Sequence, residues 1–111
     1  MENDDWGRDP SVQSMRRVFS YMEAAQEKLL AQVALSRCDR RLRVWRESAL
    51  RLFEDAWAKA SRRGLASSEE EVASLYLHCF ARVLEKGRIA LPSEALPDDE
   101  ALWKFVRELM P

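Results

Sequence analysis

His78 is the only histidine in the sequence, and it is the residue best suited to proton transfer or to accepting a phosphoryl group. Phosphotransfer domains are small helical bundles that display one exposed histidine on a helix, which makes them a functional analogy. A lysine and a small residue are expected soon after such a histidine. Cys79 and Phe80 follow His78 instead. A phosphotransfer protein centred on His78 is therefore a third-ranked hypothesis, resting on fold analogy.

The two cysteines, Cys38 and Cys79, indicate neither a metal site nor an activated nucleophile. Adjacent residues on a helix point about 100° apart, so His78 and Cys79 do not converge on one ion. No CxxC or HxxxH spacing is present, and Leu75 stands where a di-metal bundle needs a glutamate. Three isolated glycines exclude a glycine-rich phosphate loop. We expect no metal, no cofactor, no catalytic residue and two free thiols.

The composition indicates one globular domain covering residues 1–111. The chain has 18 Lys and Arg against 19 Asp and Glu, and 47% of it is hydrophobic. That apolar fraction is enough for one core, and near-neutrality excludes a polycation that binds nucleic acid with its whole surface. The acidic start, Met1 to Asp5, does not resemble a secretory signal. We expect a cytoplasmic protein without a membrane partner.

The positions of glycine and proline predict an all-α fold. Neither residue type occurs between positions 11 and 63, and no segment alternates with a period of two. Pro10 suits a first helical position, Gly64 and Gly87 suit helix ends, and either Ser67 or Ser68 suits an N-cap. The prediction is a small bundle of four helices after a short acidic arm (residues 1–9), at about 10–35, 37–63, 68–86 and 98–110.

Residues 34–41 leave two alternatives open, because the apolar pattern changes phase there. One is a tight turn, with Ser36 as the N-cap of the second helix and Asp39 reaching back to it as in a capping box. The other is one continuous helix of about 53 residues, about 80 Å long at 1.5 Å per residue. Base rates favour the turn, whereas a long helix would require a dimer to cover it.

The third predicted helix is apolar around about two-thirds of its circumference. A polar stripe interrupts it at Ser74, His78, Arg82 and Glu85. A helix with so wide an apolar surface has to be covered on several sides. The cover comes either from the same chain or from a second subunit, and the sequence does not separate the two.

Residues 37–63 carry nine basic and four acidic residues, a net charge of +5. Much of this charge is explained by a ladder of alternating sign with a spacing of four, from Arg43 to Lys59, which is typical of a solvated helix face. The candidates left for an acidic partner or nucleic acid are Arg37, Arg40, Arg41 and Arg46. A nucleic-acid-associated regulator using residues 37–46 is the second-ranked hypothesis.

Four tryptophans are many for this length, and exposed tryptophans commonly anchor interfaces. Trp45 and Trp57 fall on the predicted core stripe of the second helix, so Trp6 and Trp103 are the candidates for partner binding. The leading hypothesis is a non-catalytic protein–protein interaction or adaptor module that forms a homodimer, binds another protein, or both.

Overall fold

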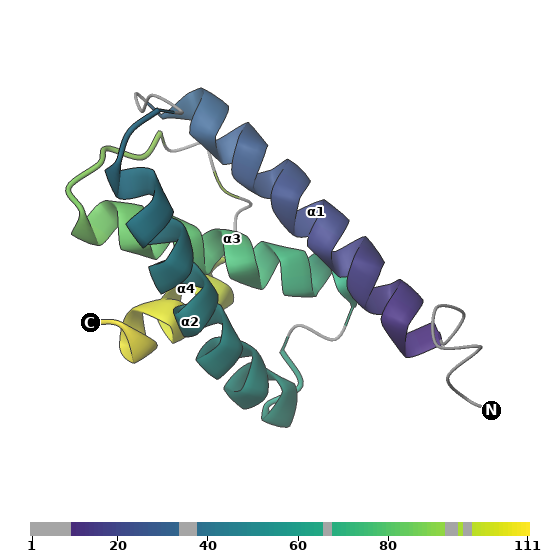
Figure 1. The fold of residues 1–111 in the computed structure, drawn as a ribbon. Helices are drawn as coiled ribbons and strands as arrows, with labels where there is room; N and C mark the ends of the chain where they lie inside the picture. The colour runs from purple at the N-terminus through teal and green to yellow at the C-terminus, as the bar shows by residue number, and fades with distance from the viewer. Residues whose placement is uncertain (1–9, 34–37, 66–67, 93–95, 97–98) are drawn as a thin grey trace.

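The computed structural model describes residues 10–33, 38–65, 68–92, 96 and 99–111, with side chains from Arg16 onward. Within these residues the chain forms four helices and no strand, which confirms the all-α prediction (Figure 1). The helices are α1 (Pro10–Gln32), α2 (Arg41–Arg62), α3 (Glu69–Lys86) and α4 (Glu100–Leu109). The predicted acidic arm, Trp6, Ser36 and Arg37 lie outside the described residues.

The turn is the correct alternative for the junction between the first two helices. Helix α1 ends at Gln32, three residues before the predicted end, and α2 begins at Arg41, four residues after the predicted start. Residues 38–40 are not helical. A single long helix is therefore excluded, and the two helices cross α3 at separate places (Figure 1).

Asp39, and not Ser36, organises the start of α2. Its carboxylate accepts a hydrogen bond from the Arg41 backbone N–H at 2.9 Å, and its carbonyl accepts one from Leu42 N–H at 3.1 Å. The N-cap position is Arg40, which makes no side-chain cap. The predicted N-cap role of Ser36 is wrong, because α2 begins only at Arg41 and Asp39 hydrogen-bonds forward to that residue; Ser36 itself lies outside the described residues.

The later two helices begin with the side-chain caps that their sequences favour. Ser68 is the N-cap of α3 and accepts from Glu71 N–H at 3.1 Å, while its hydroxyl donates to the Glu71 carboxylate at 3.2 Å. Asp99 caps α4 by accepting from Leu102 N–H at 3.1 Å. Helix α4 consequently starts two residues after its predicted start.

Helix α3 is the centre of the fold. Helices α1, α2 and α4 all pack against it, and α2 also touches α4. Phe80, Leu75 and Leu84 are fully buried within the single chain. Of the two sources of cover that the sequence left open, the chain itself supplies it, so the apolar arc of α3 no longer calls for a second subunit. The buried residues of α3 are Val72, Ala73, Leu75, Tyr76, Leu77, His78, Cys79, Phe80, Ala81, Val83 and Leu84.

Two helices end in Schellman-type turns, which place one residue in the left-handed region. After α2 that residue is Gly64, with φ of 73°, as its position in the sequence predicts. After α3 it is Arg88, with φ of 65°, while Gly87 keeps an ordinary φ of −79°. Gly87 is needed for a different reason, because a Cβ there would lie 2.8 Å from Cζ2 of Trp45.

This division of roles predicts opposite effects at neighbouring positions. Gly87→Ala should lower the free energy of unfolding by about 1–3 kcal/mol, because the added methyl overlaps the Trp45 ring. Arg88→Gly should raise it by roughly 0.5–1 kcal/mol, because glycine has no Cβ strain at positive φ but loses more backbone entropy on folding. Urea denaturation of both variants measures the two shifts. A Gly87→Ala variant as stable as the wild type would show that the ring moves aside at no cost.

Candidate interaction site

The polar stripe of α3 faces α4 and not the solvent. His78 is fully buried, which corrects its predicted place on a half-exposed polar face. Trp103 of α4 packs edge-on against the imidazole, with ring centroids 5.2 Å apart and planes at 83°. The physical reason is that α4 covers the one side of α3 that α1 and α2 leave open.

The imidazole of His78 is held in its neutral form. Its Nδ1 lies 2.6 Å from the carbonyl oxygen of Ser74, so Nδ1 carries the proton and donates it. Its Nε2 is buried with no hydrogen-bond partner among the described residues. Burial lowers the pKa of His78, opposed more weakly by the Ser74 hydrogen bond and the Asp99 carboxylate. A phosphoryl donor therefore has no direct approach to this side chain.

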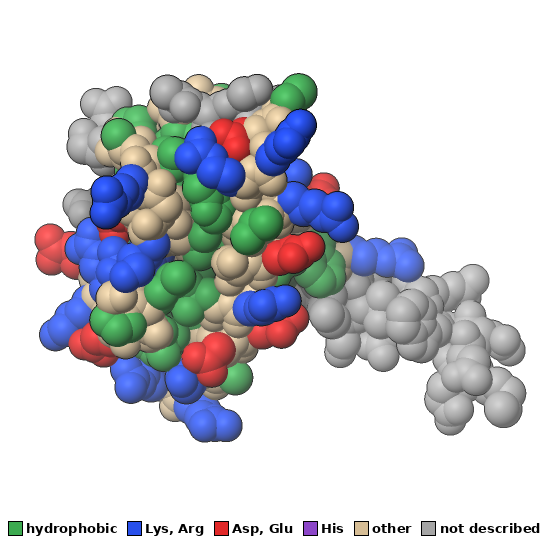
Figure 2. All heavy atoms as spheres, turned by 60° about the vertical axis from the view of Figure 1, so that its left-hand side comes forward, with side chains coloured by type: hydrophobic (Ala, Val, Ile, Leu, Met, Phe, Trp, Pro, Cys, Tyr) green, Lys and Arg blue, Asp and Glu red, His purple; other side chains and the backbone are tan. Residues whose placement is uncertain are grey.

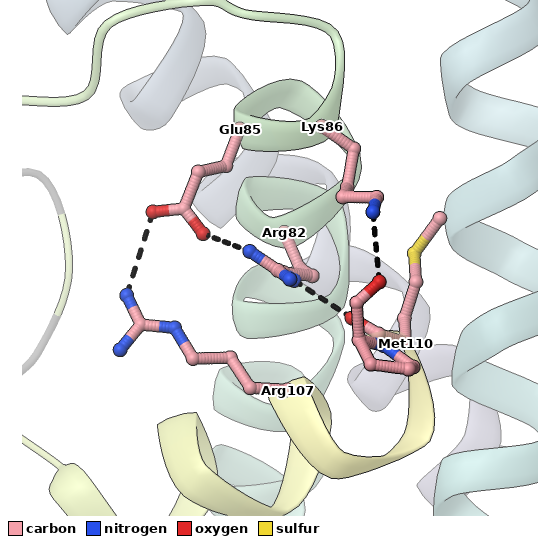
Figure 3. Close-up of polar contacts among 6 residues, drawn as sticks. Arg82, Glu85, Lys86, Arg107 and Met110 are labelled. Atoms are coloured by element: carbon pink, nitrogen blue, oxygen red, sulfur yellow. Dashed lines mark hydrogen bonds and ion pairs between the residues drawn. The ribbon is translucent and has the colours of Figure 1, made fainter.

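The rest of the stripe fastens the end of the chain to α3 (Figure 3). Arg82 donates from Nε to the carbonyl oxygen of Met110 at 2.9 Å and forms an ion pair with Glu85. Glu85 also contacts Arg107 of α4 at 3.4 Å, and Lys86 donates to the Pro111 carbonyl at 2.7 Å. The polar side chains of Arg82, Glu85 and Lys86 are thus engaged in contacts with each other, with α4 and with the end of the chain, so Arg82 and Glu85 have a structural role.

Trp103 is half-buried and lies between two side chains of the same chain. The His78 imidazole lies against one part of the ring system, and the guanidinium of Arg107 lies 4.5 Å from its centroid. The prediction that Trp103 anchors a partner has no direct test in these contacts. They show that the indole already has intramolecular neighbours.

The basic segment at the start of α2 is partly neutralised within the fold. Arg41 forms two contacts with the Asp39 carboxylate, at 3.1 and 2.8 Å, and its guanidinium lies 4.8 Å from the Trp45 ring. Arg46 lies 3.8 Å from Glu27 of α1, and Arg40 is exposed. The Asp39 pKa falls to about 2, chiefly through its hydrogen bond with the Arg41 side chain. On the face shown in Figure 2, basic and acidic side chains alternate beside a band of hydrophobic ones.

The described surface is hollowed between α1 and α2. The two helices lie close at their connection and diverge from it (Figure 1), and no described Cα of α1 is within 8 Å of one in α2. The hollow holds about 190 Å³. We call it the α1–α2 groove, lined by Val18, Phe19, Met22, Leu50, Phe53, Glu54 and Trp57.

The groove exposes large apolar side chains on both walls. Phe19 on α1 is 49% exposed and Leu50 on α2 is 42% exposed, whereas Met22 and Phe53 beneath them are buried. Phe53 and Trp57 stack on the α2 wall with ring centroids 5.4 Å apart. Among the described lining residues, Glu54 is the one that carries a charge.

A polar bridge closes the groove at the end nearest the α1–α2 connection. When the Gln26 amide is oriented so that it hydrogen-bonds both neighbours, its nitrogen donates to Tyr76 Oη at 2.5 Å and its oxygen accepts from Arg46 Nε at 3.0 Å. Burial raises the pKa of Tyr76 to about 12, so its hydroxyl stays protonated. The bridge ties α1, α2 and α3 together.

Sequence reasoning missed the groove, although a signal for it exists. Leu50 lies three residues before Phe53 and seven before Trp57, so it continues their apolar side of α2. It is 42% exposed in the structure, and Trp57, which the sequence assigned to the core, lines the groove half-buried. An apolar side of a helix that is wider than its core contact is the signal for such a groove.

Comparison with protein-family models, curated proteins and solved structures finds no match for this chain. In the described part of the chain, no group of three or more His, Cys, Asp or Glu is arranged to hold a metal ion. None of the helices searched there has the length and apolar character needed to cross a bilayer.

The buried neutral imidazole predicts a pH-dependent stability. Because the folded pKa of His78 lies below the ordinary 6.5, the unfolded chain binds the proton first as the pH falls. The contribution of the neutral His78 side chain to the free energy of unfolding is complete above about pH 6.5. Below that pH the free energy of unfolding declines by at most about 1.4 kcal/mol per pH unit. His78→Leu, which has similar volume and no titrating group, should remove this slope in denaturation curves measured from pH 8 to 5. An unchanged slope in the variant would assign the effect to other groups.

The two thiols should differ sharply in reactivity. Cys79 is fully buried in α3, and burial raises its pKa to about 12, whereas Cys38 is exposed. Since the thiolate is the reactive form, a thiol reagent at neutral pH should modify Cys38 within minutes and Cys79 only after unfolding. Mass spectrometry of the native and denatured protein counts the adducts. Rapid native modification of Cys79 would show that α3 opens readily.

Proposed function

We propose that this protein is a non-catalytic protein–protein interaction module that binds its partner in the α1–α2 groove. The observation that carries the proposal is the pair of exposed apolar residues, Phe19 and Leu50, on facing walls of an apolar hollow. Fully burying such a side chain contributes about 1.5–3 kcal/mol, so covering the exposed half of each contributes roughly 0.7–1.5 kcal/mol. A hydrophobic groove between two helices is a common binding site for the apolar face of a partner helix.

The size and lining of the groove favour side chains of a partner over a small molecule. Pockets for small ligands usually measure about 300–1,000 Å³ and contain several converging polar groups. This groove holds about 190 Å³ and has Glu54 as its charged lining residue. It therefore suits one or two bulky apolar side chains with a cation beside them.

The geometry gives less support to the two other functions expected from the sequence, phosphotransfer and nucleic-acid binding. A phosphotransfer role needs an accessible histidine, and His78 is fully buried. A nucleic-acid role needs cations that are available to phosphates, and Arg41 and Arg46 already lie beside Asp39 and Glu27. The homodimer stays a prediction.

A single substitution on the groove wall tests the proposal. Helical peptides selected from a displayed library on the wild-type protein should lose roughly tenfold or more in affinity for Leu50→Glu, because a carboxylate is then buried against apolar anchors. Val44→Glu is the matched control, since Val44 is exposed on the same helix but does not line the groove.

Fluorescence anisotropy gives the dissociation constants, and circular dichroism verifies that both variants are folded. Selected peptides that bind both variants and the wild type equally would place the interaction surface elsewhere and reject the groove.

A further inference from the structure

We propose that the occupant of the α1–α2 groove is an amphipathic helix of another protein that carries Lys or Arg beside its apolar anchors. The inference rests on the proposed function and adds the chemistry of the partner. The inference is argued from three features of the groove. These are its length, the carboxylates beside it, and the repulsion that these carboxylates would cause between two copies of the chain.

The dimensions of the groove fit about two turns of helix. Leu50 and Trp57 lie seven residues apart on one face of α2, about 10 Å along the helix axis at 1.5 Å per residue. Phe19 and Met22 form the facing wall over one turn of α1. A partner helix would place one or two bulky apolar residues in the hollow itself and further apolar residues of the same face along its walls, at spacings of three and four.

The carboxylates on the rim have no cation within the described protein. Glu54 belongs to the lining of the α2 wall, and the exposed Glu23 lies one turn after Phe19 on α1, outside the lining. Neither forms an ion pair with any described residue. The α2 wall thus presents one carboxylate beside an exposed apolar side chain, and a second carboxylate follows the exposed Phe19 on α1.

The cations near the groove do not cancel this charge. At the closed end, Arg46 pairs with Glu27 and Arg43 with Glu47, both at 3.8 Å. Arg16, three residues before Phe19, and Arg51, next to Leu50, are exposed, and both lie outside the lining. Among the described lining residues, the charged group beside the apolar anchors is therefore the Glu54 carboxylate. A partner with cations flanking its anchors complements it.

The same carboxylates argue against a second copy as the occupant. A two-fold contact brings the same patch of both protomers together. Glu23 and Glu54 of one copy would then meet those of the other copy at an apolar contact, where like charges are repelled strongly. A different chain with basic residues has no such conflict.

The closing experiment uses three synthetic helical peptides and the full chain. The first has Leu and Phe anchors at positions i, i+3, i+4 and i+7 with flanking lysines, the second has the same anchors with flanking glutamates, and the third has the lysines with polar residues in place of the anchors. At about 50 mM salt the first should bind roughly tenfold tighter than the second, and the difference should shrink at about 300 mM because salt screens exposed charges. The third should not bind.

Charge reversal on the rim supplies the decisive comparison. Glu23→Lys combined with Glu54→Lys should invert the preference, so that the peptide with flanking glutamates binds tighter. Glu108→Lys, an exposed carboxylate on α4, is the matched control and should leave the preference unchanged.

The outcomes separate this inference from the proposed function. One outcome is that Leu50→Glu abolishes the binding of both anchored peptides while the wild type binds the two equally, or binds the glutamate peptide more tightly. That result would overturn the inference of a basic partner and support the groove as the binding site. If the wild-type protein binds no peptide but forms a dimer in light scattering, and Leu50→Glu dissociates that dimer, then the occupant of the groove is a second copy of the chain. Absence of both peptide binding and self-association rejects the groove itself.

Discussion

The burial of α3 around its whole circumference is the constraint on which the rest of the structure depends. Eighteen residues of helix with apolar side chains on most sides need cover from three directions, and α1, α2 and α4 each supply one. Because α1 and α2 both pack on α3 rather than on each other, they diverge away from their connection. The groove between them is therefore a consequence of covering α3 with two long helices and one short one.

The polar stripe of α3 shows how charged and titratable groups serve this packing. Arg82, Glu85 and Lys86 bind backbone carbonyls or side chains at the end of the chain, and His78 lies under Trp103. A buried arginine or histidine is tolerated only where its polar atoms find partners, and most of them do here. His78 Nε2 is the exception among described residues, so the imidazole stays neutral at a cost that grows as the pH falls.

The basic character of the second helix is likewise absorbed mainly by local structure. Asp39 stands directly before α2 and holds Arg41 through both carboxylate oxygens, which offsets the unfavourable placement of arginines at the positive end of a helix. Arg46 crosses to α1, where Glu27 and Gln26 receive it. The charged residue among the described residues that line the groove is acidic, Glu54, although it belongs to the segment whose composition is basic.

The sequence by itself determined the all-α class and most of the helix ends, because glycine, proline and capping residues act locally. It predicted Gly64 at positive φ and a cap at Ser67 or Ser68, and it included the turn between α1 and α2 among its alternatives. It did not determine which side of α3 each neighbour covers, since a periodic pattern identifies a polar stripe without showing what packs on it. Only the tertiary structure decided that His78 is buried, that Gly87 makes room for Trp45, and that Phe19 and Leu50 face each other. Each of these depends on contacts between segments far apart in the chain, which helix periodicity does not encode.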